Sequence, residues 1–201
     1  MESKLTGRMD RKKALMQKKI IAAAVKLFNR HGLEAVSMEQ IAEEVDIARG
    51  TLYNYFPSKE LIINAYLQET FRDRNEDRLA ELQKLPDTRT RLTWLLTVLI
   101  RGVQAQKQIF EAFMVYRMKQ VLSFRPVADA PSGLSVLAKE IIRLGQADHE
   151  LRSDLPVALL EELFEFVLIE AIKPSFLEPE TFDPQQSISQ CVDLFINGAK
   201  A

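Results

Sequence analysis

The chain has 201 residues, of which 47% are hydrophobic and 27% charged, and its formal net charge is -1. This balance is typical of a globular protein with one or two compact units, and it excludes a low-complexity or collagen-like chain. No apolar run approaches the ~20 residues of a membrane span, the charged N-terminus has no signal-peptide core, and Cys191 is the only cysteine. We therefore expect a cytoplasmic protein that has no intrachain disulfide and makes no membrane contact.

Basic charge is concentrated at the N-terminal end of the chain. Residues 1–60 contain 11 Lys and Arg against 8 Asp and Glu, whereas residues 61–201 contain 16 against 20. A DNA-binding end needs such a bias, because neutralising phosphates supplies much of the non-specific affinity. A solvated basic helix face would give the same composition, so charge alone leaves both interpretations open.

Apolar periodicity predicts helices along the whole chain and no convincing strand. A first helix is expected over Arg11–Arg30, and Gly32 suits the left-handed residue that ends it. Ser37 opens a second helix, Met38 to about Val45, with a capping box of the form S-x-x-Q. After a three-residue connection, a short third helix is expected over Arg49–Tyr55.

The fourth helix is expected to run unbroken from about Lys59 to about Lys84, long enough to join a head to a separate body. Proline and glycine divide the remainder, with a loop around residues 125–133. Further helices are expected at about 89–104, 106–123, 134–148, 155–172 and 184–197. The predicted fold is therefore all-α, with about nine helices.

The second and third helices have the dimensions of a helix-turn-helix. The third is poorly chosen for stability alone, because Gly50 in its first turn costs up to ~1 kcal/mol relative to alanine. On DNA its polar side chains have uses: Thr51 and Arg49 can reach base edges, and phenol groups can bind phosphates. Two short helices at a bundle corner are the alternative.

Several segments of the N-terminal part match the pattern of a known family. They are I-I-A-A-A-V-K-L-F from Ile20, Gly32, Ser37, Ile41-Ala42 and G-T-L-Y-N-Y-F-P-S-K-E-L from Gly50. They resemble the DNA-binding domain of the TetR family in register over about residues 16–62. A weaker similarity to the family covers G-Q-A-D-H-E-L-R-S-D-L from Gly145.

This resemblance implies an N-terminal three-helix DNA-binding domain with a basic tail at residues 1–60, and a helical effector-binding and dimerisation domain at 61–201. It also implies a homodimer on a near-palindromic operator in double-stranded DNA, acting as a repressor. The residues that it places against DNA are Ser37, Arg49, Gly50, Thr51, Tyr53, Asn54, Tyr55 and Lys59. Arg49, Thr51 and Asn54 would select bases, and the hydroxyl and lysine side chains would hold phosphates.

Two positions depart from the family pattern. Asp46 stands in the turn where most members have glycine, and Ala48 stands where most have a serine or threonine cap. Both changes bear on operator choice. The basic segment Arg8–Lys13 has two open interpretations: an arm that reaches into the minor groove, or a disordered solvated tail.

In the C-terminal part, the resemblance implies a small-molecule pocket and a dimer through helices at about 155–172 and 184–197. The effector is unknown, and no cofactor or metal is expected. Candidate pocket residues are Trp94, Arg101, Phe110, Phe113, Met114, Tyr116 and Arg117, although an aromatic and methionine stripe is more often plain core.

An enzyme is one rival interpretation, and no metal-ligand spacing, phosphate loop or nucleophile elbow supports it. The two histidines, His31 and His149, lie far apart in sequence at helix ends. A second rival is a ligand-blind or nucleoid-type DNA-binding protein without a pocket. Activation in place of repression stays open from the sequence.

Overall fold

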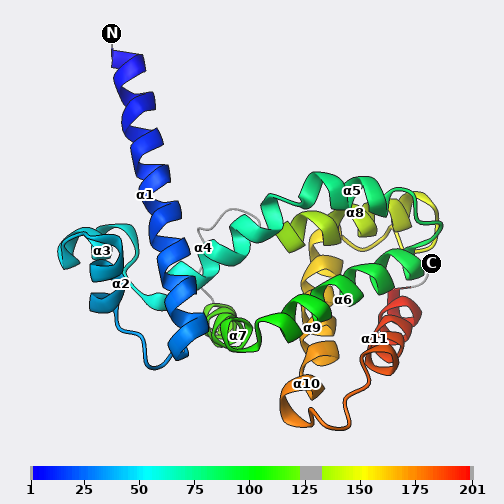
Figure 1. Cartoon of the computed structure of the whole chain (residues 1–201). Coiled ribbons are helices and arrows are strands. Elements are labelled where there is room, and N and C mark those ends of the chain that lie inside the picture. The colour runs from blue at the N-terminus through cyan, green and yellow to red at the C-terminus, as the bar shows by residue number, and fades with distance from the viewer. Residues whose placement is uncertain (1, 123–132, 200–201) are drawn as a thin grey trace. The chain divides into compact units, whose positions relative to one another are not determined.

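The computed structural model describes residues 2–122 and 133–199, and every regular element in them is a helix (Figure 1). Their bounds are α1 (Glu2–His31), α2 (Met38–Val45), α3 (Arg49–Tyr55), α4 (Lys59–Arg72), α5 (Asn75–Leu82), α6 (Thr88–Ala105), α7 (Lys107–Leu122), α8 (Gly133–Ala147), α9 (Val157–Ile172), α10 (Pro174–Leu177) and α11 (Pro184–Ala199). The all-α prediction is confirmed. The loop predicted around 125–133 lies almost entirely outside the described residues.

The helices form two packing units. The first, here called the head, contains the described residues up to Glu69 together with α7, and the second, here called the body, contains those from Thr70 to Gln106 and from Gly133 onward. The predicted division at residue 60 falls at the start of α4, so residues 59–69 and α7 pack with the DNA-binding helices. The division at residue 60 remains a proposal about function.

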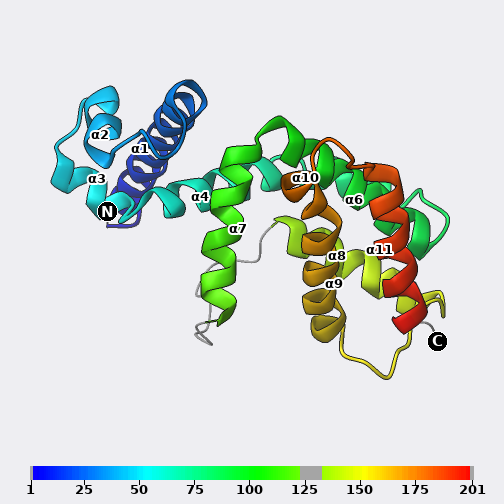
Figure 2. The ribbon, with the colours of Figure 1, turned by 90° about the horizontal axis from the view of Figure 1, so that it is seen from below.

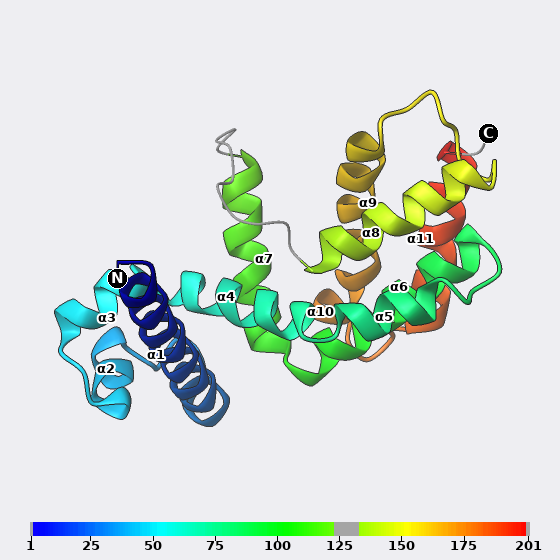
Figure 3. The same ribbon diagram turned by 90° about the horizontal axis from the view of Figure 1, so that it is seen from above.

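The head has a continuous apolar core. In Figure 3, α2 and α3 lie beside α1, and the three helices bury Ile20, Ile41 and Leu52, each fully enclosed. Ile62 of α4 is also fully enclosed, and Ile109 of α7 is only 2% exposed within the same core. The α7 helix is thus anchored in the head, which the sequence pattern did not predict.

The first helix is longer than predicted. It begins at Glu2 instead of Arg11, so the basic segment Arg8–Lys13 continues the helix. The helical conformation contradicts a disordered tail, and contact of this segment with the duplex stays a prediction. At the other end, Gly32 has the expected positive φ of 81°, and its N–H donates to the Phe28 carbonyl at 2.9 Å. That conformation is open to glycine at little steric cost.

The capping signals around α2 are confirmed. Ser37 Oγ accepts a hydrogen bond from the Gln40 N–H at 3.2 Å, and the Ser37 N–H donates to Gln40 Oε1 at 2.8 Å. Asp46 ends α2 with φ 60° and ψ 54°, in the left-handed region. Glycine adopts this conformation most readily, and aspartate is among the few other residues that tolerate it.

The body packs α6 against α8, α9 and α11 (Figure 2), and α5 lies along α8 (Figure 1). Leu92, Leu95 and Leu96 of α6, Ile141 of α8 and Phe164 of α9 are almost completely buried. The helix starts and ends after residue 88 follow the predicted punctuation to within about two residues, and the one-turn helix α10 was not predicted.

The unbroken fourth helix is wrong, because it divides into α4 and α5 at Asp73–Arg74. The break lies where α8 begins: a Cβ added to Gly133 would stand 2.3 Å from Phe71 Cβ, and Asn75 Nδ2 donates to the Gly133 carbonyl at 3.2 Å. The Arg74 N–H donates back to the Phe71 carbonyl at 3.3 Å, which tightens the last turn of α4. A tertiary contact therefore ends the helix, with no proline or glycine at the break.

Candidate nucleic-acid interface

The α3 helix has one face in the core and one face in solvent. Leu52 is fully buried and Phe56, directly after the helix, is 6% exposed, so the pair at i and i+4 fixes the helix on the head. Thr51, Tyr53 and Asn54 are exposed on the other side. This arrangement presents a row of polar side chains on a firmly packed helix, as reading a major groove requires.

Gly50 lies on this exposed face with open space around it. A Cβ built there would meet nothing within 4 Å, so no contact within the protein requires glycine. Glycine in the first turn of a helix weakens the helix, and the cost is therefore not offset by packing. The open space fits the predicted close approach of the α3 backbone to a partner.

Arg49 takes part in a cluster with one residue from each helix of the motif. Its Nε lies 2.8 Å from Glu39 Oε1, and its guanidinium carbon is 5.4 Å from the centre of the Tyr53 ring. The hydrogen bond with the Tyr53 side chain, followed by the charge of Glu39, raises the pKa of Arg49. The pKa of Glu39 is lowered, chiefly by a hydrogen bond that its carboxylate accepts from the Glu39 backbone N–H, and also by the charge of Arg49. The cluster thus holds Arg49 charged and oriented at the start of α3.

Glu39 was not among the predicted site residues. A carboxylate beside a DNA-reading surface is counterintuitive from sequence, because it repels phosphates. The available signal was its position, two residues after the Ser37 cap and on the outer side of the motif. The structure brings it to Arg49, where it can orient a base-reading arginine.

Three predicted DNA contacts already have partners within the head. Ser37 Oγ serves the capping box, and Tyr55 is half-buried against the head core. The Lys59 amine donates to the Leu33 carbonyl at 2.8 Å, and so ties the start of α4 to the loop before α2. Of the predicted DNA contacts, Arg49, Gly50, Thr51, Tyr53 and Asn54 are exposed on α3, here called the α3 face, and Ser37, Tyr55 and Lys59 also contact the head itself.

The α3 helix has no side-chain cap. Ala48 occupies the N-cap position with extended φ and ψ, and no side chain accepts from the first turn. Replacing Ala48 with serine should let its hydroxyl accept from the Gly50 or Thr51 N–H, which stabilises the helix by about 1 kcal/mol. Slower hydrogen exchange of the α3 amides measures this gain. The same change at exposed Ala22, inside α1, should give no protection, and equal effects at both sites would contradict the assignment.

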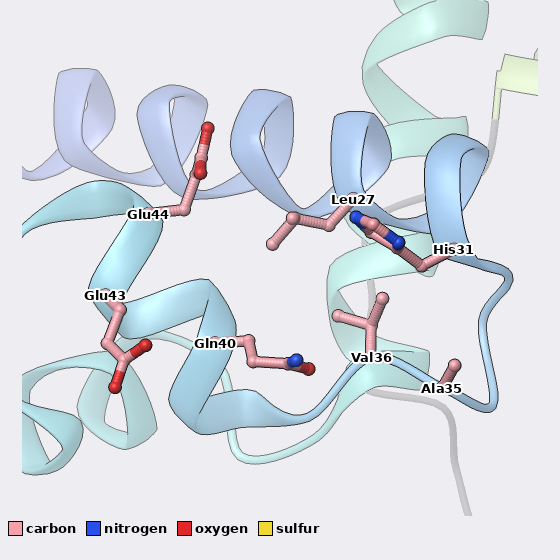
Figure 4. Close-up of a pocket in the computed structure, with 7 residues that line it drawn as sticks. All are labelled: Leu27, His31, Ala35, Val36, Gln40, Glu43 and Glu44. Atoms are coloured by element: carbon pink, nitrogen blue, oxygen red, sulfur yellow. The ribbon is translucent and has the colours of Figure 1, made fainter.

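A shallow groove lies on the same unit between α1 and α2 (Figure 4). Its volume is about 440 Å³, and Leu27, His31, Ala35, Val36, Gln40, Glu43 and Glu44 line it. Glu44 is paired with Lys26 at 2.7 Å. With two carboxylates in its lining, the groove does not suit a phosphate, and none of the predicted pocket residues lies in it.

The predicted pocket residues divide between the two units. Trp94 is half-buried and Arg101 exposed on α6 of the body, whereas Phe110, Phe113, Met114 and Tyr116 lie on α7 of the head. Phe113 packs against the head core, and the centres of the Phe110 and Phe113 rings are 5.8 Å apart. The side chain of Arg117 lies outside the described ones. Part of this aromatic stripe is therefore core, and its role in a pocket remains a proposal.

The body exposes an apolar stripe on the helices predicted to pair. Leu159, Leu163 and Phe166 recur along α9 at i, i+4 and i+7 and are 41%, 46% and 50% exposed, and Leu194 of α11 is 75% exposed. Their buried counterparts on the same helices, Phe164 and Phe195, hold α9 and α11 together. The stripe is thus additional to what packing within one chain uses.

Two further properties concern the described residues as a group. They contain no cluster of three or more His, Cys, Asp or Glu side chains arranged to hold a metal ion. None of their helices combines the length and the apolar character that crossing a membrane requires.

Comparison with known sequences identifies the N-terminal unit. The model of the family "Bacterial regulatory proteins, tetR family" matches residues 20–66, which include the capping box, α3 and the start of α4. The HTH-type transcriptional repressor KstR of Mycolicibacterium smegmatis is 36% identical over 113 residues, which are 55% of this chain and 53% of KstR. The HTH-type transcriptional regulator RutR of Escherichia coli is 36% identical over 66 residues, which are 33% of this chain and 31% of RutR. The chain thus spans about half the length of KstR and about a third of the length of RutR.

Comparison with solved structures extends the likeness in fold to both units. Thermus thermophilus FadR, a TetR-family repressor solved with lauroyl-CoA, has a TM-score of 0.73 and 21% identity over 90% of this chain and 94% of FadR. RolR, solved with resorcinol, has a TM-score of 0.71 and 19% identity over 94% of this chain and 90% of RolR. Residues 20–66 thus match the DNA-binding domain of the tetR family, and the chain shares its all-helical fold with solved TetR-family structures.

Proposed function

We propose that this protein is a ligand-responsive, non-enzymatic transcriptional repressor that acts in the cytoplasm. In this proposal it binds a near-palindromic operator as a homodimer, and a small-molecule effector releases it. The observation that carries the proposal is the exposed polar face of α3, with Arg49, Thr51 and Asn54 on a helix fixed by buried Leu52. The KstR relative is a repressor, which supports repression over activation.

The apolar stripe on α9 supports pairing of two chains. Three large side chains between 41% and 50% exposed on one helix face are costly in water, and burying them against a two-fold copy removes that cost. A two-fold dimer presents two copies of α3 to one duplex, about one helical turn apart.

An effector is supported by the fold neighbours, which were solved with lauroyl-CoA and with resorcinol. Because those two ligands differ in size and charge, the fold alone does not select a ligand class. The continuous fourth helix that was expected to join the head to the body breaks at Asp73–Arg74, so it cannot transmit a signal to the head as one rigid rod. We infer that α7 carries the signal, because Ile109 is buried in the head core and only Gln106 separates α7 from α6 of the body.

Selection of bound sequences from random duplexes, with the purified full chain at near-physiological salt, tests the function. A near-palindrome with half-sites about ten base pairs apart is expected. Enrichment of no sequence, with binding to every duplex alike, would favour a ligand-blind DNA-coating protein and contradict the proposal.

Glu39 provides a sharper test of the α3 face. Its bond to Arg49 Nε leaves those terminal N–H groups of the guanidinium that Tyr53 does not engage for the O6 and N7 atoms of a guanine. Replacing Glu39 with glutamine should therefore weaken the preference for guanine at one half-site position by roughly tenfold, while removing a negative charge raises affinity for all sequences.

The same selection experiment measures both effects. Glu43→Gln removes an equal charge from exposed α2 without touching Arg49, so it should raise overall affinity and leave the preference intact. If Glu39→Gln behaves like Glu43→Gln, Glu39 does not orient Arg49. If Arg49→Ala leaves the selected operator unchanged, Arg49 does not read a base.

A further inference from the structure

Arg78 of α5 carries a charge that the described part of the body leaves without a counterion. Its guanidinium carbon lies 5.1 Å from the centre of the Phe71 ring, and its Nη1 is fully enclosed and has no hydrogen-bond partner. The ion pairs that the described residues form do not include Arg78. Enclosed cationic nitrogens in proteins are normally paired, because leaving one unpaired is costly.

The surroundings make this position more positive. Burial, and then the nearby charge of Arg74, lower the pKa of Arg78, and Glu81 opposes them only partly. Both effects disfavour the charged form of a side chain that stays protonated in proteins. An anion placed beside the guanidinium would offset both.

A second unsatisfied atom lies in the same segment. Asn75 Nδ2 donates to the Gly133 carbonyl, but Asn75 Oδ1 is enclosed and has no partner. Gly133 is the first residue of α8, and the close approach of its Cα to Phe71 fixes that helix end beside the break between α4 and α5. The first turn of α8 contains no acidic residue that would neutralise its positive end.

We propose that Arg78 binds the anionic group of the effector, a carboxylate or a phosphate, at the break between α4 and α5. The unpaired Nη1 supplies a donor, and the Phe71 ring lies against the guanidinium, 5.1 Å from its carbon to the ring centre. Asn75 Oδ1 is an acceptor, so it would take a protonated or hydroxyl group next to the anion. This inference rests on the proposed effector-responsive function and names the ligand chemistry of that response.

Thermal denaturation of the purified full chain tests the site without DNA. Melting temperatures are compared in potassium phosphate, potassium acetate and potassium chloride at matched ionic strength, for the wild type, Arg78→Met and Arg143→Met. Arg143 is the matched control, because it is an exposed arginine of α8 in the same unit and is paired with Glu140. Methionine keeps the apolar stem and removes the charge.

We expect phosphate or acetate to raise the melting temperature of the wild type and Arg143→Met by about 3 to 6 °C at ten times its Kd. Arg78→Met should show no rise and should melt in chloride at or above the wild-type temperature, because an unpaired enclosed charge is gone. A rise in melting temperature with acetate indicates that the effector carries a carboxylate. A rise with phosphate alone indicates that it carries a phosphate.

Two results would overturn the site. An equal rise in the melting temperature of all three proteins would indicate an adventitious ion only. An Arg78→Met protein that melts below the wild type in chloride would indicate that Arg78 is a structural arginine. Operator selection is measured separately, so failure of this site and failure of the proposed function are distinct results.

Discussion

Replacing Leu52 with alanine is expected to abolish operator binding while the body stays folded. Leu52 is the only buried residue of α3 and is fully enclosed, so the change leaves a cavity beneath the recognition helix. Truncations of this kind cost about 2–5 kcal/mol, a large share of the stability of a small unit. Gel-shift titration measures the lost affinity, and hydrogen exchange of the α1–α3 amides measures the loosened head.

Two features of the chain control this experiment. Thr51→Ala changes a neighbouring exposed side chain of the same helix, and should alter operator preference without loosening the head. Trp94, the single tryptophan, lies in the body, so its fluorescence reports whether that unit remains folded. Unchanged amide exchange in Leu52→Ala would show that α3 is held by something other than this contact.

Replacing Leu163 with aspartate should convert the dimer into monomers and weaken operator binding by roughly 10²–10⁴-fold. Leu163 lies in the middle of the exposed stripe on α9, between Leu159 and Phe166, and a carboxylate there has no partner when a second chain covers it. The affinity falls because each monomer then reads one half-site without the other.

Light scattering after gel filtration gives the mass, and gel-shift titration on the selected operator gives the affinity. Leu177→Asp is the matched control, because Leu177 is 70% exposed on α10 and stands outside the stripe. It should leave both mass and affinity unchanged. A Leu163→Asp protein that remains dimeric would place the dimer contact elsewhere.

Local signals predicted the head well. Ser37 and Gln40 are three residues apart and satisfy each other's backbone, so the start of α2 is encoded within four residues. Gly32 likewise takes the left-handed conformation that the sequence requires. Leu52 and Phe56 define the inner face of α3, and the outer face follows as its complement.

Contacts between distant residues were not predictable in the same way. Residues 73–74 contain no helix breaker, and the break depends on Gly133, about sixty residues further along the chain. The bonds of Lys59 to Leu33 and of Arg49 to Glu39 also join different elements, so no periodicity reveals them. Burial of Ile109 in the head depends on how α7 packs, which a stripe of apolar residues cannot specify.

The internal bonds of the basic residues bear on how operator affinity responds to salt. Among the nine Lys and Arg of residues 1–60 whose side chains the structure describes, four already contact the protein itself: Lys19, Lys26, Arg49 and Lys59. A plot of log K against log salt concentration falls by about 0.9 for each phosphate neutralised, through release of condensed counterions. Cations tied to carbonyls and carboxylates displace no counterions unless those bonds open, so the slope per head should fall well short of the basic residue count. In the proposed function, fewer basic side chains of the head are therefore available to neutralise phosphates than its composition implies. More of the operator affinity then depends on how α3 fits the DNA.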